Sequence, residues 1–402
     1  MVPKGWLKYS VGELCTSIVP GRNKPKVFDG DIPWVTTPEI NGRYIPSKLQ
    51  VNYVSTTALS DAGGKIVPQG AVVMAAVGEL GLIAITSEPV VLNQQLHAFV
   101  CSKLVNNEYL AYWLTTQKPY MESIASKTTI PYMNKANCES IPVLLPPLAE
   151  QFKIAQILLT WDNAISVTEK LLTNSQQQKK ALMQQLLTGK KRLLDENGVM
   201  FSGEWEVVRL KQLIHEEKKR NRDNHIQRVL SVTNHSGFVL PEEQFSKRVA
   251  SEDVSTYKIV KKNQYGYNPS RLNVGSFARL DNYDEGVLSP MYVVFSINHE
   301  RLNSDYFLNW MSSNEAKQRI AGSTQGSVRD SVGFDALCSF SFSLPTLMEQ
   351  QKIAAVLSAA DAEMSMLEKK LACLKEEKKA LMQQLLTGKR RVKVESEETV
   401  SA

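Results

Sequence analysis

The 402-residue sequence has little of what marks secreted or membrane proteins. Its cysteines are few, odd in number and never spaced as C-x-x-C; they are Cys15, Cys101, Cys138, Cys338 and Cys373. This usage indicates reduced thiols and neither a disulfide framework nor a zinc site. The longest apolar run, near 71–77, is far shorter than the about 18 residues of a membrane span. No charged-then-apolar leader is recognisable, so we expect a cytoplasmic protein.

Motifs of catalysis are also missing. The sequence has no H-E-x-x-H, G-x-S-x-G or G-x-G-x-x-G pattern. A phosphate-binding loop ending at Lys190 would need a glycine where Gln184 stands, and Ser270 with Arg271 breaks an adenine-methyltransferase-like motif that begins at Asn268. The histidines have no metal-ligand partners at suitable spacing. We therefore predict a non-enzyme with no catalytic residues, no metal site and no cofactor of its own.

The composition is that of a folded protein with more than one domain. Hydrophobic residues make up 43% and charged residues 22%, which excludes a disordered chain. The length exceeds that of an ordinary single domain. The net charge of +6 is only a weak indication of a nucleic-acid partner.

The chain contains a long internal repeat. Lys179–Lys190 recurs without a change at Lys378–Lys389, an offset of 199 residues. The same offset carries Leu145–Ala155 onto a similar segment and Trp6 onto Trp205. A period of 199 is too long for a solenoid, whose repeats span about 20–50 residues. The sequence is a tandem duplication, which predicts an internal pseudo-twofold and a partner of matching form.

Each copy ends in a segment with the signals of a long helix. Proline precedes and glycine follows both segments, from Pro146 to Gly189 and from Pro345 to Gly388. Between these signals the apolar spacing alternates between four and three, as in a heptad seam of roughly 40 residues. The apolar seam positions are Ile154, Leu158, Trp161, Ile165, Leu172, Leu182, Leu186, Ile353, Leu357, Met364, Leu367, Leu371, Leu374, Leu381 and Leu385.

Two matched helices of this kind predict an antiparallel coiled coil. Each helix leaves one domain and is expected to approach the other domain at its far end. The alternative is an amphipathic helix packed on its own domain, but a helix of about 60 Å is longer than a small domain. Lys179 and Lys378 lie on the seam and either fix the register or mark where it opens to another protein.

The parts before the helices are predicted to be mixed α/β domains of about 150 residues. Apolar runs such as 71–77, 82–86 and 292–297 indicate strands, and Tyr109–Trp113 aligns with Tyr306–Trp310 as a short helix. We divide the chain into a first domain (1–147), a central long helix (148–195), a second domain (196–346), a C-terminal long helix (347–391) and a disordered tail (392–402).

The polar residues of both domains suit DNA better than catalysis, since Arg and Lys pair with guanine, Gln and Asn with adenine, and hydroxyls with phosphate. The candidates are Arg22, Lys24, Lys26, Thr36, Thr37, Arg43, Gln94, Gln95, Lys127 and Thr128 in the first domain, and Lys218, Lys219, Arg220, Arg222, Arg271, Arg279, Ser323, Thr324, Gln325, Ser327 and Arg329 in the second. The alternative is that these are ordinary basic surface loops. Residues 1–147 carry 12 basic and 10 acidic side chains, so either the positive charge is strongly polarised to one side or a partner supplies phosphate contacts.

These features together resemble the specificity (S) subunit of type I restriction-modification systems, over nearly the whole chain. The most specific markers are Leu145–Ile154, Leu344–Ile353 and the paired ends Leu186–Lys190 and Leu385–Lys389. Gly30–Val35 and Gly322–Gln325 also look like parts of that family's target recognition domains. Lys127–Thr129 departs from the Gly-Ser-Thr-like run expected in the first domain.

The resemblance implies an α+β fold in which two mixed α/β target recognition domains are joined by two long antiparallel coiled-coil helices. Each domain would recognise one half of an asymmetric bipartite site in double-stranded DNA, and the helix pair would set the spacer. Two modification subunits carrying S-adenosylmethionine would dock on the helices, and restriction subunits would use ATP and Mg in cleavage. The setting would be a prokaryotic cytoplasm.

Two other interpretations stay open. One is a coiled-coil scaffold whose twin domains bind proteins. The other is the recognition subunit of a related system with a fused methylase-nuclease partner.

Overall fold

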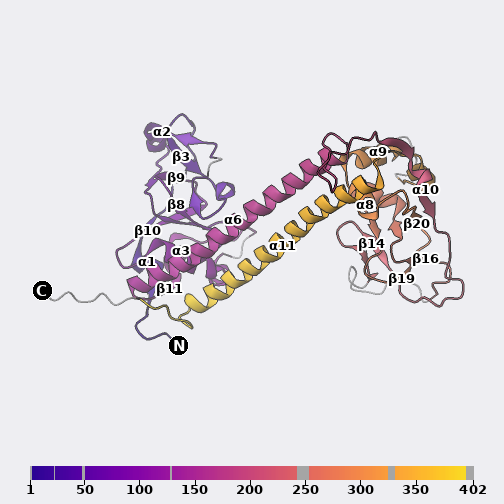
Figure 1. Cartoon of the computed structure of the whole chain (residues 1–402). Helices are drawn as coiled ribbons and strands as arrows, with labels where there is room; N and C mark the ends of the chain where they lie inside the picture. The colour runs from indigo at the N-terminus through magenta and orange to yellow at the C-terminus, as the bar shows by residue number, and fades with distance from the viewer. Residues whose placement is uncertain are drawn as a thin grey trace. The chain divides into compact units, whose positions relative to one another are not determined.

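The computed structural model describes residues 2–21, 23–47, 50–126, 129–241, 253–324 and 331–394. It divides into two compact units, Met1–Glu169 with Lys370–Ala402, and Lys170–Lys369. Each unit contains one globular domain, the beginning of one long helix and the end of the other (Figure 1).

Two mixed sheets form the domain of the first unit. The larger has the order β2-β10-β7-β8-β4 and the smaller β5-β3-β9-β6, while β1 pairs with β11. The strands are β1 (Leu7–Ser10), β2 (Cys15–Ile18), β3 (Ile32–Val35), β4 (Tyr44–Ile45), β5 (Tyr53–Val54), β6 (Ile66–Val67), β7 (Val72–Ala75), β8 (Ile83–Thr86), β9 (Val90–Leu92), β10 (Leu96–Cys101) and β11 (Pro142–Leu145). The helices are α1 (Val11–Leu14), η1 (Thr37–Glu39), α2 (Thr56–Asp61), α3 (Asn107–Thr116), α4 (Lys118–Ile124) and α5 (Lys135–Glu139).

The second unit repeats this plan in its described residues. One sheet has the order β13-β20-β17-β18, and β12-β21, β14-β15 and β16-β19 are pairs. The strands are β12 (Glu206–Arg209), β13 (Ile214–Glu216), β14 (Ser231–Thr233), β15 (Gly237–Val239), β16 (Lys258–Lys261), β17 (Tyr265–Tyr267), β18 (Phe277–Arg279), β19 (Glu285–Leu288), β20 (Val293–Ile297) and β21 (Ser341–Leu344). The helices are η2 (Leu210–Gln212), η3 (Pro269–Val274), α8 (Ser304–Met311), α9 (Asn314–Thr324) and α10 (Phe334–Cys338).

The two domains share strand order as well as sequence. β2-β10-β7-β8 corresponds to β13-β20-β17-β18, and β1-β11 to β12-β21. The apolar runs predicted as strands form β7, β8 and β20, and the aligned aromatic segments lie in α3 and α8. The structure therefore confirms these assignments. The strand predictions succeed because continuous apolar runs are typical of strands that are covered on both faces.

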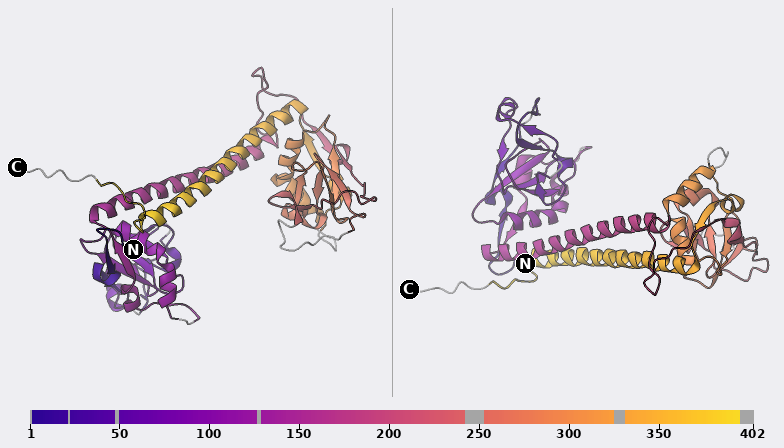
Figure 2. Two further views of the ribbon diagram at one scale, coloured as in Figure 1. Left: turned by 90° about the horizontal axis from the view of Figure 1, so that it is seen from below. Right: turned by 45° about the horizontal axis from the view of Figure 1, so that its top comes forward.

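The predicted long helices are α6 (Leu148–Leu186) and α11 (Leu347–Leu385). Every predicted seam position on both helices is buried or half-buried. Within each unit the helices run side by side in opposite directions (Figure 1 and Figure 2). In the first unit Asp162 pairs with Lys378 and Glu169 with Lys375, at 2.5 and 2.8 Å. The antiparallel pair is therefore confirmed.

The seam lysines have partners across the helix pair. Lys378 binds Asp162, and Lys179 binds Asp361 at the equivalent place in the second unit. These contacts favour the register role over an opening of the seam, because an ion pair between two helices is satisfied at one alignment only.

Each long helix begins on one domain core and ends in the other. Leu158 of α6 packs in the core of the first domain, together with Leu385 and Leu386 at the end of α11. The second core contains Leu357 of α11, with the end of α6. Each domain therefore needs both helices to complete its hydrophobic core.

A buried carboxylate fastens the helices at each domain. Glu349 at the start of α11 accepts hydrogen bonds from Arg192 and from Trp205 Nε1, the latter at 3.1 Å. Glu150 and Arg391 repeat the contact 199 residues away. Charge-assisted hydrogen bonds of this kind are stronger than neutral ones and fix geometry.

Among the described residues, no helix is both long and apolar enough to cross a membrane. Of the predicted tail, Val392 packs against the core of the first domain. Residues 395–402 lie outside the described residues.

Candidate DNA interface

A polar hollow of about 310 Å³ opens on the first domain. It is lined by Gly21, Asn23, Lys24, Trp34, Thr36, Asn52, Asn93, Gln94 and Gln95. Four of the predicted DNA contacts, from three separate segments, meet here, and Thr37 joins them through a hydrogen bond to Gln95. The side chains are mainly amides, which can donate and accept toward the edge of a base.

The sheet explains why these segments meet. β3 and β9 pair in parallel, so the residues that follow both strands emerge at the same edge. The Asn93 amide nitrogen donates to the Val35 carbonyl at 3.0 Å. Gln95 Oε1 accepts from Thr37 Oγ1 and from Asn93 Nδ2, both at 3.2 Å. These two bonds engage the Gln95 amide oxygen, and the Gln95 NH₂ group is one of the donors that the hollow can offer.

Aromatic and acidic neighbours support the rim of the hollow. Lys24 Nζ lies 5.5 Å above the Phe28 ring, and Phe28 packs edge-on against Trp34. The Thr36 hydroxyl and backbone nitrogen both donate to Glu39, which caps η1. Lys26 is exposed but does not line the hollow.

Several predicted contacts lie outside the described residues or side chains. The residues outside are Arg22, Lys127, Thr128, Gln325, Ser327 and Arg329, and for Thr324 the structure gives only the end of α9. They stay predictions.

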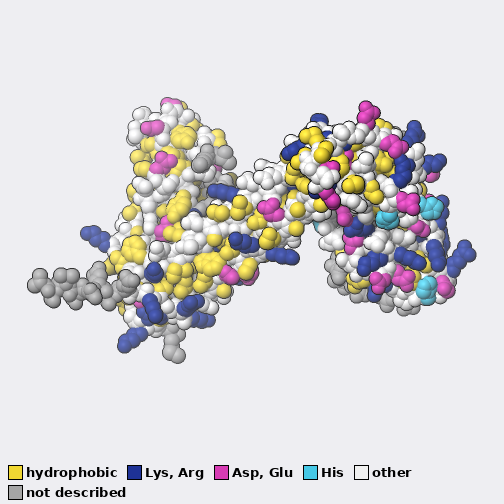
Figure 3. Space-filling view, viewed as in Figure 1, with side chains coloured by type: hydrophobic (Ala, Val, Ile, Leu, Met, Phe, Trp, Pro, Cys, Tyr) yellow, Lys and Arg dark blue, Asp and Glu magenta, His cyan; other side chains and the backbone are white. Residues whose placement is uncertain are grey.

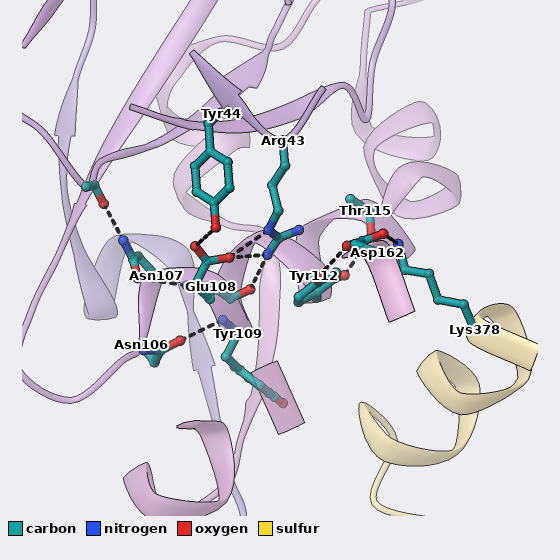
Figure 4. Close-up of polar contacts among 11 residues, drawn as sticks. Arg43, Tyr44, Asn106, Asn107, Glu108, Tyr109, Tyr112, Thr115, Asp162 and Lys378 are labelled. Atoms are coloured by element: carbon teal, nitrogen blue, oxygen red, sulfur yellow. Dashed lines mark hydrogen bonds and ion pairs between the residues drawn. The ribbon is translucent and has the colours of Figure 1, made fainter. Parts of the chain in front are cut away.

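Arg43 belongs to an internal network, which argues against its predicted DNA contact (Figure 4). Its Nε donates to Glu108 Oε2 at 2.7 Å, and its guanidinium lies 3.5 Å from the centre of the Tyr112 ring. The side chain is only 17% exposed. Tyr44 donates to the other Glu108 oxygen, and burial, with that bond, raises the pKa of the Tyr44 hydroxyl. A paired and stacked guanidinium has little left to offer guanine or phosphate.

The same argument applies to the predicted DNA contact of Arg279, which stays a prediction. It donates to Asp281 at 2.6 Å and to Asp305 at 2.7 Å, and its side chain is 18% exposed. Burial alone would lower the pKa of Arg279, but the bonds to these carboxylates raise it. Arg43 and Arg279 thus each bind an acid in the first turn of a helix, α3 or α8.

The basic segment 218–222 of the second domain lies along β16. Arg220 bridges to Lys258, and the Ile259 amide donates to the Lys219 carbonyl at 2.9 Å. The buried Asn221 holds the following turn through its side-chain amide. This backbone presents four predicted contacts, all exposed, namely Lys218, Lys219, Arg220 and Arg222.

Positive charge is concentrated beside this segment. Burial lowers the pKa of Lys258, and the charges of Arg220 and Lys218 lower it further, although Glu216 opposes them. Neighbouring cations of this kind attract an anion. The exposed side chains of this segment are candidates for phosphate contacts, although Lys218 also pairs with Glu216 at 3.0 Å.

The remaining candidates of the second domain lie on two packed elements. Arg271 is exposed on η3, which packs against α9. Ser323 of α9 donates its hydroxyl to the Ile320 carbonyl within its own helix. These residues share a surface region with each other but not with the basic segment in any described contact.

The place equivalent to the amide hollow differs in chemistry. Val229 makes a parallel bridge to Val287 of β19, as β3 does to β9. Asn93–Gln95 follows β9, whereas Ser289–Met291 follows β19. Met291 is 57% exposed. The same framework therefore carries amides in one domain and an apolar residue in the other.

Some lining residues were not predicted from the sequence. Asn93 directly precedes Gln94 at the end of an apolar run, so a local signal existed. Asn52 reaches the hollow because its carbonyl accepts from the Trp34 amide at 2.9 Å. That pairing between β3 and its neighbour has no signal in the sequence.

The sequence profile of the type I restriction modification DNA specificity domain matches residues 3–174 and again 202–376. The chain belongs to this family. The two matches coincide with the duplication, so the chain carries the specificity domain twice.

Relatives in the family are distant in sequence. The MjaVIII type I restriction enzyme specificity subunit of Methanocaldococcus jannaschii is 26% identical over 313 residues, which are 73% of this chain and 72% of the relative. The HindI specificity subunit of Haemophilus influenzae is 22% identical over 44% of this chain and 39% of its own.

Solved structures share the fold. The S subunit of a type I system from M. genitalium aligns with a TM-score of 0.59 at 12% identity, over 96% of both chains. A chain from a structure on complex assembly and conformational transition of the type I system aligns with a TM-score of 0.54 at 14% identity, over 97% of this chain and 100% of its own.

Proposed function

We propose that this chain is the DNA specificity subunit of a type I restriction-modification complex and that each domain recognises one half of an asymmetric bipartite site. The observation that carries the proposal is the duplicated specificity domain with unlike surfaces at the same place. Amides line that place in the first domain, and Ser289–Met291 takes it in the second. Two unlike surfaces on one framework suit two unlike half-sites.

The partners are two modification subunits that dock on the helix pair, carry S-adenosylmethionine and methylate adenine. Hydrophobic side chains gather on the visible face of the two helices (Figure 3). Exposed large hydrophobic residues of α6 and α11 include Leu148, Phe152, Val167, Leu171, Met348 and Met366. Exposed apolar area of this kind supports docking of another protein. Restriction subunits with ATP and Mg complete the complex, in a prokaryotic cytoplasm.

The test is the methylome of a host that carries the complete system. We expect adenine methylation at one bipartite motif. Replacing residues 1–147 by the corresponding domain of a relative is expected to change one half of the motif and leave the other half and the spacer unchanged. Absence of such a motif, or a change in both halves, would rule the proposal out.

Two alternatives give different results. A protein-binding scaffold, which the exposed apolar residues of the helices favour, would show no sequence-dependent retention of a DNA pool when combined with its partner. A recognition subunit for a fused methylase-nuclease would still show a motif, but the neighbouring gene would encode both activities in one chain.

A further inference from the structure

We propose that Tyr112, Asp162 and Lys378 form a lock that holds the first domain at one position on the helix pair and so sets the place of its half-site. This inference rests on the function proposed above. The lock joins one residue of the domain to one residue of each long helix.

The contacts of the lock are direct (Figure 4). The Tyr112 hydroxyl, on α3, donates to Asp162 Oδ2 of α6 at 2.5 Å. The other oxygen of Asp162 accepts from Lys378 Nζ of α11, also at 2.5 Å. Lys378 Nζ lies 5.4 Å from the centre of the Tyr112 ring. Both helices are therefore bound by one aromatic side chain.

The surroundings of Tyr112 make these contacts strong. Tyr112 is 1% exposed, whereas the side chains of Asp162 and Lys378 are 30% and 22% exposed. Burial raises the pKa of Tyr112, and the hydrogen bond to Asp162 raises it further, so the hydroxyl stays a donor. A hydrogen bond to a carboxylate and a cation above an aromatic face each hold their groups in a narrow geometry.

The same ring is connected to the segment that carries the DNA-facing hollow. Arg43 lies against Tyr112 and is bound to Glu108. It follows Glu39 closely in the chain, and Glu39 caps the turn that begins at Thr36 of the hollow. The lock therefore fixes α3 and, through Arg43, the base of the segment that presents the hollow.

The second unit has the helix contact without the lock. The ion pair of Lys179 with Asp361 repeats that of Lys378 with Asp162, but Asn309 takes the place of Tyr112. The Asn309 amide donates to the carbonyl of Asp305 in its own helix, at 2.8 Å.

The corresponding corner of the second unit is hollow. A cavity of about 470 Å³ lies there, lined in part by Lys179, Ser312 and Ser313. Among the described residues, the bond from an aromatic hydroxyl to the carboxylate of the seam ion pair thus belongs to the first domain.

The consequence concerns the spacer and not the bases. With the lock intact, the first domain holds its half-site at one distance along the helix pair. Without it, the domain stays anchored by the core residues that it shares with both helices and keeps its hollow, but its orientation about that anchor is less restricted. The set of accepted spacers then widens while both half-sites keep their bases.

The experiment uses the complete complex, expressed with plasmids in which the spacer of the motif is varied one base pair at a time. The variants are Tyr112→Phe, which removes only the hydroxyl, and Asp162→Asn. The matched control is Asp361→Asn, which weakens the equivalent helix contact in the second unit, where Asn309 stands in place of Tyr112. In the first two, we expect methylation at spacers one base pair from the native length to rise about tenfold, as loss of a charge-assisted hydrogen bond permits. The control is expected to keep the native spacer.

The outcomes separate the lock from the proposed function. A complete absence of a bipartite motif in the unaltered complex contradicts the proposed function itself. If that motif is present and Tyr112→Phe and Asp162→Asn keep the native spacer, the lock is wrong. Equal widening by Asp361→Asn would show that the helix pair alone sets the spacer, which also overturns it, as would changed bases in either half-site. If Tyr112→Phe does not fold, Asp162→Asn decides.

Discussion

Glu150 and Glu349 are equivalent residues whose surroundings differ in exposure. The Glu349 side chain is 1% exposed and its partner Arg192 20%, whereas Glu150 is 9% exposed and Arg391 42%. Removing one member of a buried pair leaves the other charge without compensation, and water screens such a charge when it is exposed. The same chemical contact therefore stabilises the two units unequally.

The first prediction uses this pair. Glu349→Ala is expected to lower the free energy of unfolding by about 3 kcal/mol, because Arg192 loses its carboxylate in a partly buried place. Glu150→Ala is expected to cost clearly less. Urea unfolding followed by tryptophan fluorescence measures both, since Trp205 and Trp6 each contact the glutamate concerned. Equal losses would contradict the exposure argument.

His97 predicts a pH dependence of stability. It is 7% exposed on β10, and burial lowers its pKa, although the charge of Glu139 opposes this in part. The unfolded chain, with a histidine pKa of about 6.5, then takes up a proton before the folded chain does. Stability therefore falls as the pH drops below about 6.5, because the unfolded state binds more protons.

The measurement is the urea midpoint between about pH 7.5 and 5, where histidine titrates. His97→Gln is expected to flatten its decline on the acid side. His235→Gln, at an exposed position, is the control and should keep the decline of the unaltered chain. An unchanged slope in His97→Gln would show that other groups cause the decline.

At this scale, the structure places some of the predicted contacts together in the hollow and holds others in internal ion pairs. Gln94 and Gln95 were found because two exposed amides follow an apolar run, a purely local pattern. Arg43 was predicted to contact DNA because no neighbouring residue in the sequence indicates its ion pair with Glu108. Glu108 lies 65 residues further along the chain. The partner of a side chain depends on which strands pair, and the residue types of a loop do not show which strands pair.

At the scale of elements, the identical twelve-residue segments have a physical explanation. Each segment ends a long helix with two leucines that enter the core of the other domain. Both segments must therefore pack against similar core residues, while the recognition loops are free to differ. The heptad seam was predictable because its period is local, whereas the parallel pairing of β4 with β8 joins residues far apart in sequence.

The glycines after the long helices supply a prediction about helix ends. Gly189 and Gly388 have φ values of +68° and +69°, the left-handed region that favours glycine. A Cβ at Gly189 would make ordinary contact with Trp205, but one at Gly388 would clash with Pro3. Gly189→Ala is expected to cost about 1–2 kcal/mol, and Gly388→Ala more. Thermal unfolding of both variants tests the order, and a smaller loss for Gly388→Ala would contradict it.

At the scale of the whole molecule, duplication and charge fit a shared task. Residues 196–346 contain 18 basic and 18 acidic side chains, so the second domain has no excess of charge for phosphate. The affinity of a protein for DNA increases with the number of phosphates that its Lys and Arg side chains neutralise. The near-neutral second domain therefore fits the proposal that this chain selects bases while other subunits contribute phosphate contacts.

The helix pair provides the last prediction, which concerns the spacer. Adding one heptad after Glu169 and one before Lys370 lengthens both helices by about 10 Å and keeps the antiparallel seam in phase. Since one base pair rises about 3.4 Å, the spacer is expected to grow by up to about three base pairs while both half-sites keep their bases. Methylome sequencing of a host with the altered system measures this directly.

The control for this prediction is the heptad added to α6 alone. It shifts one helix past the other, so the pairs Asp162–Lys378 and Lys179–Asp361 can no longer form together. Reduced methylation without a new spacer is the expected result, because each domain core needs the end of the opposite helix. If the paired insertion left the spacer unchanged, the helices would not act as a ruler. If it changed the bases of a half-site, recognition would depend on the helix pair and not on the domains.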